Sequence, residues 1–169
     1  FRRPYASWRL KGDPDAVSYV LIAFLAVVGL LDLMEALTPS GDADSLAYHF
    51  TLPKLFIDAG YIEFVPRALD GATAMLVQMT YIPVLGLGGE TALLLWLFIS
   101  GWIAVGAVYI LARRHLCLNW SLALAAVFAT TPAIVYSAGS GQVESRNLLF
   151  VITAMLALTT DADDKTLSF

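Results

Sequence analysis

Long apolar stretches alternate with short polar segments along this chain of 169 residues. The first apolar run covers residues 16–37, and a second, at 90–112, would be about 33 Å long as a helix, which is enough to cross a bilayer. Two more apolar runs follow at 119–138 and 147–160, and the last of these is short for a crossing. The pattern predicts an all-α, integral membrane helical bundle with about four spans in one transmembrane domain, 1–169.

Residues 38–89 form the longest interval between apolar runs, and we expect them to be an external loop with helices of its own. Apolar positions recur there at roughly helical spacing at Leu46, Phe50, Leu55 and Phe56. Gly60 follows as a suitable C-terminal stop. This loop is therefore predicted to contain one or two amphipathic helices that lie on the membrane surface.

Basic residues indicate how the chain is oriented in the membrane. The polar arm 1–15 carries a group of cations, namely Arg2, Arg3, Arg9 and Lys11. Arg113 and Arg114 close the apolar run 90–112. Because basic flanks favour the cytoplasmic side, both are predicted to lie inside, with the N-terminus cytoplasmic and the loop outside. An even number of crossings must then separate them, so the uncharged segment 71–89 is predicted to be re-entrant or interfacial.

Composition agrees with a membrane protein and narrows the range of functions. Hydrophobic residues make up 59% of the chain and charged residues 14%, with a mean hydropathy of +0.73, above the balance of soluble domains. A net charge of -4 and the lack of a basic stripe argue against nucleic acid as a partner. The single cysteine, Cys117, allows no internal disulfide and matches no zinc-binding spacing. Since the chain starts at Phe1 and ends at Phe169 after an acidic run, we expect it to be a piece of a longer protein.

Carboxylates are the clearest candidates for chemistry. Asp42 and Asp44 follow the first span directly, and Glu144 lies in the polar segment between the third and fourth apolar runs. Under the predicted topology, all three reach the outer face of the membrane. A partly desolvated carboxylate can act as a general base, whereas two or three together can hold a divalent cation through oxygen ligands. No cofactor is certain from these residues, and a divalent cation is the one that they would suit.

Polar and basic side chains near these acids suit a substrate that bears phosphate. Lys54 and Arg146 can bind a phosphate or pyrophosphate leaving group. Tyr48 lies four residues after Asp44, so on a helix the two would share a face, and His49 follows it. The sequence therefore predicts a polar site at the outer end of the bundle.

Each candidate also has a purely structural interpretation, and the residues alone leave both open. Asp44 can cap the helix that follows it, and Asp42 can be a solvated loop acid. His49 can pack at the interface, because no second histidine stands nearby to share a metal. Glu144 and Arg146 can pair with each other at the start of a helix.

Several short motifs resemble a family of membrane enzymes. The segment Asp42-Ala43-Asp44-Ser45-Leu46-Ala47-Tyr48-His49, with the later Leu52-Pro53-Lys54-Leu55 and Gly60-Tyr61-Ile62, resembles the first external loop of bacterial GT-C glycosyltransferases. This superfamily includes protein O-mannosyltransferases and aminoarabinose transferases. The similarity continues through Pro66, Leu87-Gly88-Gly89, Tyr109-Ile110-Leu111-Ala112-Arg113-Arg114 and Thr130-Thr131-Pro132-Ala133. It covers most of the chain from about residue 38 onward, and order and spacing make it more specific than any single motif.

The resemblance implies which carboxylates would act. In the family, an aspartate of the first loop is the catalytic or metal-binding carboxylate, typically in an Asp-acid-x-x-Tyr context. Asp44 with Tyr48 fits that position best, and Asp42 is the second candidate. A later acid, usually aspartate, opens the helix after the third span. Glu144 takes that place here, which keeps the charge but lengthens the side chain.

The implied activity is inverting transfer of a sugar from a polyprenyl-phosphate carrier to an acceptor at the outer face of a bacterial inner membrane. Asp44 would deprotonate or orient the acceptor hydroxyl, and Lys54 or Arg146 would stabilise the departing lipid phosphate. Tyr48 and His49 would complete the substrate-binding set. Membrane lipids and the polyprenyl-phosphate sugar would be the partners of such an enzyme.

The number of spans separates this chain from the family. GT-C enzymes generally have about twice as many membrane helices as the roughly four predicted here, and the later helices help to build the lipid-carrier groove. The alternative function is therefore that of a non-catalytic, GT-C-derived accessory subunit, which stabilises a larger membrane complex through other membrane subunits.

Overall fold

The computed structural model describes residues 14–66, 76–138 and 140–161, and within those ranges it contains helices and no strands. The α-helices are α1 (Ala16–Ala36), α2 (Thr51–Ala59), α3 (Tyr81–Arg113), α4 (Leu118–Ala129), α5 (Pro132–Ala138) and α6 (Glu144–Asp161). A π-helix, Ser45–His49, precedes α2, and a 3-10 turn, Gln78–Thr80, precedes α3. The all-α prediction is thus confirmed for the described residues.

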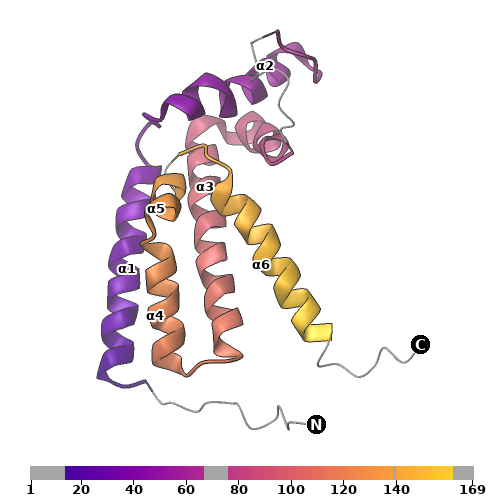
Figure 1. The fold of residues 1–169 in the computed structure, drawn as a ribbon. Helices are drawn as coiled ribbons and strands as arrows, with labels where there is room; N and C mark the ends of the chain where they lie inside the picture. The colour runs from indigo at the N-terminus through magenta and orange to yellow at the C-terminus, as the bar shows by residue number, and fades with distance from the viewer. Residues whose placement is uncertain (1–13, 67–75, 139, 162–169) are drawn as a thin grey trace, which may run out of the picture.

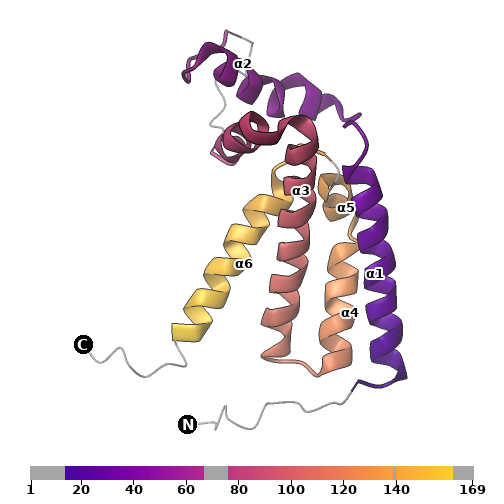
Figure 2. The ribbon, with the colours of Figure 1, turned by 180° about the vertical axis from the view of Figure 1, so that it is seen from behind.

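Helices α1, α3 and α4 run side by side, and α5 continues the direction of α4 toward the end of the bundle where α2 lies (Figures 1 and 2). Helix α6 packs against α3 and diverges from it toward its C-terminal end. Helix α2 lies across the end of the bundle that the chain reaches after α1. This arrangement brings the segments after α1 and α5 to the same end.

Within the described ranges, two helices have the length and composition to cross a membrane. They are Ala16–Ala36 and the helical segment Gln78–Arg113. In the most apolar 18 residues of α1, only 11% are buried inside the protein. Large apolar side chains therefore cover the outside of α1, including Val20, Val27 and Leu31. A helix that is apolar all round suits a lipid environment or the core of a larger assembly.

The ends of α1 and α4 are joined by polar side chains. Asp15 caps α1 by accepting from the backbone N–H of Ser18 at 2.9 Å. Asn119 at the start of α4 donates to Asp15 at 2.9 Å and accepts from the Ser18 hydroxyl at 2.5 Å. These contacts fix the two helices to each other at the end opposite α2.

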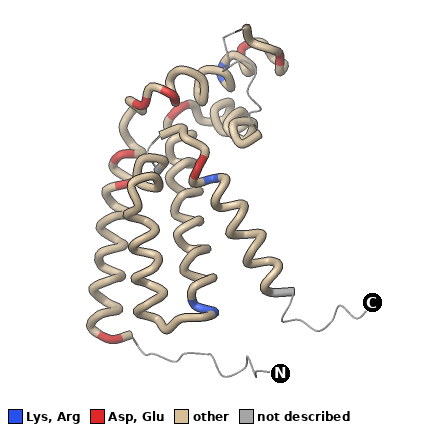
Figure 3. The backbone as a smooth tube through the Cα atoms, in the orientation of Figure 1, with Lys and Arg blue, Asp and Glu red and all other residues tan. Residues whose placement is uncertain are grey.

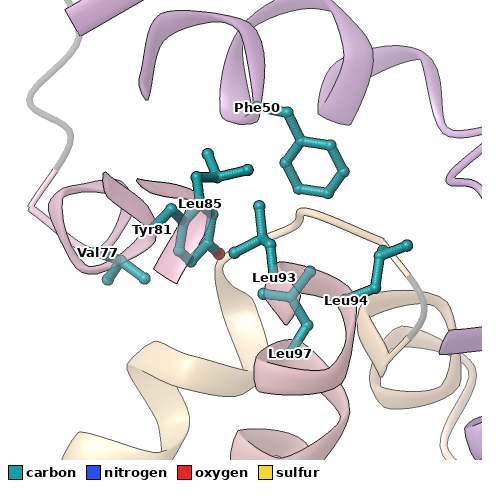
Figure 4. Close-up of a cluster of buried hydrophobic side chains, with 7 residues drawn as sticks. All are labelled: Phe50, Val77, Tyr81, Leu85, Leu93, Leu94 and Leu97. Atoms are coloured by element: carbon teal, nitrogen blue, oxygen red, sulfur yellow. The ribbon is translucent and has the colours of Figure 1, made fainter. Parts of the chain in front are cut away.

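Helix α3 bends at Gly89, whose backbone has φ 66° and ψ -161°, a conformation essentially restricted to glycine. The part before the bend turns aside and packs near α2 (Figures 1 and 2). A buried cluster fills this corner, consisting of Phe50, Val77, Tyr81, Leu85, Leu93, Leu94 and Leu97 (Figure 4). The segment predicted to be re-entrant or interfacial, 71–89, is thus separated from the long helix by a bend, while residues 71–75 lie outside the described ranges.

The predicted apolar runs coincide with helices, with small shifts at their ends. Run 119–138 is two helices, because Thr130 and Thr131 interrupt it before Pro132, which stands at the first position of α5. Helix α6 begins at Glu144 rather than at residue 147, since its first turn is polar yet helical. The expected amphipathic helix in the loop is α2, and it stops at Gly60, which has φ 78°.

Charged groups are unevenly distributed between the two ends of the bundle. Most acidic residues gather at the end that carries α2, where Lys54 and Arg146 also lie, whereas Arg113 and Arg114 lie with Asp15 at the opposite end (Figure 3). The candidate carboxylates belong to the acidic end.

Candidate functional site

The candidate site lies where residues 42–49 meet residues 136–146, and we call this contact the junction. Three hydrogen bonds connect the two segments directly. Tyr136 donates to Asp42, Gly141 N–H donates to the Ser45 hydroxyl at 2.6 Å, and the Gln142 amide donates to Asp44 at 3.3 Å. The predicted proximity of the first-loop aspartates to the segment around Glu144 is therefore present in the structure.

Asp42 caps the helical turn that begins the junction. Its Oδ2 accepts from the backbone N–H of Ser45 at 2.7 Å and from the Ser45 hydroxyl at 2.5 Å, while Oδ1 accepts from Tyr136. Burial raises the pKa of Asp42, but the hydrogen bonds from Ser45 and Tyr136 outweigh it, so the pKa lies below its ordinary value. Asp42 is thus an ionised structural cap rather than a solvated loop acid.

Asp44 has a different environment from the one expected of a capping residue. Its side chain makes no capping hydrogen bond to the π-helix, because Asp42 already serves that end. Asp44 is exposed and accepts one hydrogen bond, from Nε2 of Gln142 at 3.3 Å. Of the two interpretations left open for Asp44, the structure does not show the helix cap, and its carboxylate is held at the surface by an amide from the opposite segment.

Residues 45–49 adopt a π-helix, in which Phe50 N–H reaches the carbonyl of Ser45 at 2.9 Å. Such turns are rare and often occur at functional sites. The spacing of four residues still leaves Tyr48 and Asp44 on one side of such a wide turn. Tyr48 packs against the buried pair Leu52 and Phe56, with its ring centroid 4.0 Å from that of His49.

Gly141 is the closest point of contact between the two segments. A Cβ atom at this position would lie 2.6 Å from the Phe50 ring and 2.9 Å from the Ser45 hydroxyl. The backbone of Gly141 donates to Ser45, and its carbonyl accepts from the buried hydroxyl of Tyr81 at 3.2 Å. Only glycine fits here with the surroundings unchanged, so this residue sets how closely the junction packs.

His49 is buried beneath the junction, with 2% of its surface exposed. Nδ1 lies 2.8 Å from Nε2 of Gln78, an amide nitrogen that can only donate, so the ring proton is on Nε2. That Nε2 is buried without a hydrogen-bond partner among the described residues. Burial lowers the pKa of His49, while the nearby Gln142 side chain and the carboxylate of Asp44 oppose the fall. His49 is therefore a neutral, buried side chain that faces the acidic part of the junction.

Arg146 is buried and serves the junction as a structural clamp. Its guanidinium donates to the carbonyls of Ser137 at 3.0 Å, Gln142 at 2.7 Å and Ser140 at 3.3 Å. These are the backbone groups left open at the end of α5 and in the following loop. Arg146 forms these bonds rather than the ion pair with Glu144 that the sequence left open. Only 3% of its surface is exposed.

Lys54 and Glu144 occupy exposed or half-exposed positions. Lys54 on α2 forms an ion pair with Glu90, just after the bend in α3. Glu144 is exposed at the first residue of α6, where the positive end of the helix dipole favours a carboxylate. Of the two predicted phosphate ligands, Lys54 reaches the surface and Arg146 does not.

The expected divalent-cation site of Asp42, Asp44 and Glu144 is not assembled in the structure. The described residues contain no group of three or more His, Cys, Asp or Glu side chains that could hold a metal ion. Asp42 points its two oxygens at Ser45 and Tyr136, and Asp44 is turned to Gln142. The carboxylates are thus near one another in the fold but are committed to separate hydrogen bonds.

An open pocket of about 470 Å³ lies beside the junction. It is lined by Glu35 of α1, by residues 40–43, and by Tyr136 and Ser140 from the end of α5. Neither Tyr136 nor the pocket was predicted, because a tyrosine inside an apolar run carries no sign of the aspartate that it contacts in the fold. Asp42 lines the pocket, whereas Asp44 does not.

No protein-family model, curated protein or solved structure matches this chain.

Proposed function

We propose that this chain is part of a multi-pass protein of a bacterial inner membrane, with a cytoplasmic N-terminus and the junction at the outer face. Two apolar helices of spanning length support a membrane location, with α4–α5 and α6 proposed as further spans. The separation of acids from Arg113 and Arg114 supports the orientation, since basic flanks favour the cytoplasm. Helix α2 would then lie at the outer membrane surface.

The proposed activity is transfer of a sugar from a polyprenyl-phosphate carrier to a hydroxyl acceptor, as in the GT-C enzymes that the motifs resemble. One observation carries it: the exposed carboxylate of Asp44 is held by Gln142, from a segment about 100 residues away in sequence, at the acidic end of an apolar bundle. An apolar bundle suits a lipid-linked substrate, and an oriented surface carboxylate suits proton abstraction.

In this mechanism, Asp44 accepts the proton of the acceptor hydroxyl as its oxygen attacks the anomeric carbon. The bond between that carbon and the phosphate oxygen breaks, and the phosphate leaves with the electron pair on the opposite face, which inverts the anomeric carbon. Lys54 is the proposed cation for the departing phosphate, because its ion pair with Glu90 is largely solvated and weak enough for phosphate to compete. Arg146 instead holds the loop that carries Gln142.

The alternative, a non-catalytic GT-C-derived accessory subunit, has its own supporting observation. The buried cation at the junction, Arg146, binds three backbone carbonyls through its two terminal nitrogens, so these nitrogens are not available to a phosphate. An accessory subunit whose role is to stabilise a complex through its helices would still need Arg146 to hold the loop between α5 and α6. The apolar outside of α1 would then contact other membrane subunits rather than lipid.

Asp44→Asn tests the catalytic proposal. The substitution keeps the shape of the side chain and its bond from Gln142, but removes the basic carboxylate. We expect the lipid-linked sugar substrate to accumulate in cells that carry it and the product glycan to fall by at least about 100-fold, the usual scale of general-base catalysis. Mass spectrometry of lipid-linked sugars and surface glycans measures both.

Asp58→Asn is the matched control, since Asp58 is an exposed acid of α2 outside the junction. It should leave both pools at the wild-type level. Equal pools in wild type and Asp44→Asn, with both proteins present in the membrane in equal amount, would reject the enzyme and favour the accessory subunit.

A further inference from the structure

The pocket beside the junction has no role in the chemistry assigned to Asp44, which does not line it. Its walls come from three places in the fold: the last turn of α1, the loop 40–43 and the end of α5. Its volume of about 470 Å³ falls within the roughly 300–1,000 Å³ typical of small-molecule sites. The pocket is thus large enough for a ligand of its own.

Polar groups in the wall favour a ligand that carries hydroxyls. Glu35 lines the pocket and is exposed, so its carboxylate can accept hydrogen bonds from ligand hydroxyls. Tyr136 donates its proton to Asp42 and also interacts with the Gln142 side chain, so its phenol oxygen has at most one further lone pair to offer a ligand. Carboxylates and phenols lining the same pocket accept hydrogen bonds well, and the aromatic ring gives an apolar surface.

The charge of the lining excludes anions. Glu35 and Asp42 both line the pocket, and its described lining residues include no lysine, arginine or histidine. The nearby cations are committed elsewhere, Lys54 to Glu90 and Arg146 to backbone carbonyls. A phosphate group would therefore meet two carboxylates without compensation.

We infer that this pocket binds a sugar-sized, hydroxyl-bearing ligand that has no negative charge. Glu35 is then a specificity-determining residue, which admits neutral or cationic polyols and rejects acidic ones.

Gly41→Cys provides a reporter inside the pocket. Gly41 lines the pocket and is exposed, and an added Cβ there has no neighbour within 4 Å. The variant is made in a Cys117→Ser background, which removes the only native thiol. Its reaction rate with a cationic trimethylammonium-ethyl methanethiosulfonate is compared with that of the anionic sulfonatoethyl reagent. Each rate is divided by the rate of the same reagent with free 2-mercaptoethanol.

We expect the normalised rate to favour the cationic reagent by about tenfold, the lower end of electrostatic focusing in an acidic cleft. Glu35→Gln should reduce this preference to about threefold or less. Glu63→Gln, which removes an exposed acid that does not line the pocket, should leave it unchanged. Equal normalised rates for the two reagents, or an equal loss of preference in both glutamine variants, would overturn the inference.

Ligand protection tests the hydroxyl preference with the same reporter. A panel of methyl hexosides, added in rising concentration, should slow the labelling of Gly41→Cys in a saturable manner for at least one member. The matching hexose 6-phosphates should not slow it. Protection by the phosphates, or by no member of either panel, contradicts the inference. Neither readout depends on activity, so the outcome of Asp44→Asn is separate from both.

Discussion

Gly141→Ala probes the contact on which the junction depends. The added methyl group would lie 2.6 Å from Cε1 of Phe50, 2.9 Å from the Ser45 hydroxyl and 3.1 Å from Cβ of His49. Phe50 and His49 are each 2% exposed, so neither side chain has open space to move into. The loop must therefore withdraw from the π-helix, or the buried side chains must leave their rotamers.

The size of the effect follows from what the substitution displaces. Overpacking a filled site costs about 1–3 kcal/mol. If the loop withdraws, the bonds from Gly141 to Ser45 and from Tyr81 to Gly141 are lost, each worth about 0.5–1.5 kcal/mol net. We expect a loss of stability of about 2–4 kcal/mol, which corresponds to a fall in Tm of roughly 4–16 °C for a chain of this length.

Thermal melts in mild detergent, followed by far-UV circular dichroism, measure the effect. Gly106→Ala is the matched control, because Gly106 lies in α3 with no atom within 4 Å of an added Cβ. Alanine should be neutral there or stabilise the helix by about 0.5–1 kcal/mol. If Gly141→Ala melts together with Gly106→Ala, the close packing of the junction is wrong.

Three further substitutions test separate features of the fold. Arg146→Lys keeps the charge but cannot reach the three carbonyls at once, so we expect a loss of about 2–4 kcal/mol in the same melts, and an unchanged Tm would contradict the clamp. Gly89→Ala forces a side chain into φ 66° and should cost about 1–3 kcal/mol, whereas Gly86→Ala, in open helical space, should cost nothing; equal melts would refute the bend. Asp42→Asn should lower the stability most above about pH 5. The folded state lowers the pKa of Asp42, so the ionised carboxylate contributes its full stability above the ordinary pKa of 3.8, and this contribution is lost as the pH falls through the folded pKa. A difference in Tm between variant and wild type that stays constant down to about pH 3 would refute this.

Hydropathy and turn residues were enough to locate most helices in advance. The apolar runs at 16–37 and 90–112 match helical segments, and Gly60 ends α2 as its position suggested. These features depend on local sequence, because period, capping and glycine act over a few residues. The proximity of the first loop to the segment after α5 also followed, once the order of the helices was fixed.

Side-chain roles at the junction were harder to anticipate. Asp42 and Asp44 differ by two positions, and only the location of Tyr136 and Gln142 decides which one caps the turn. The π-helix at Ser45–His49 has no signal in the residues themselves. The sequence suggests that Arg146 binds an anion, whereas in the structure it donates to carbonyls at the end of α5. Each error arises from partners that are distant in the chain.

The polar tie between Asp15, Ser18 and Asn119 has a mechanical consequence for the pocket at the far end of α1. Helix α1 has 21 residues and is therefore about 30 Å long, and it is pinned to α4 where it starts. Near its other end, α1 is tied to α3, because Trp102 donates to Asp32 at 3.0 Å. Polar bonds therefore hold α1 at both ends, and they fix the position of Glu35, which stands one turn beyond Asp32 in the wall of the pocket.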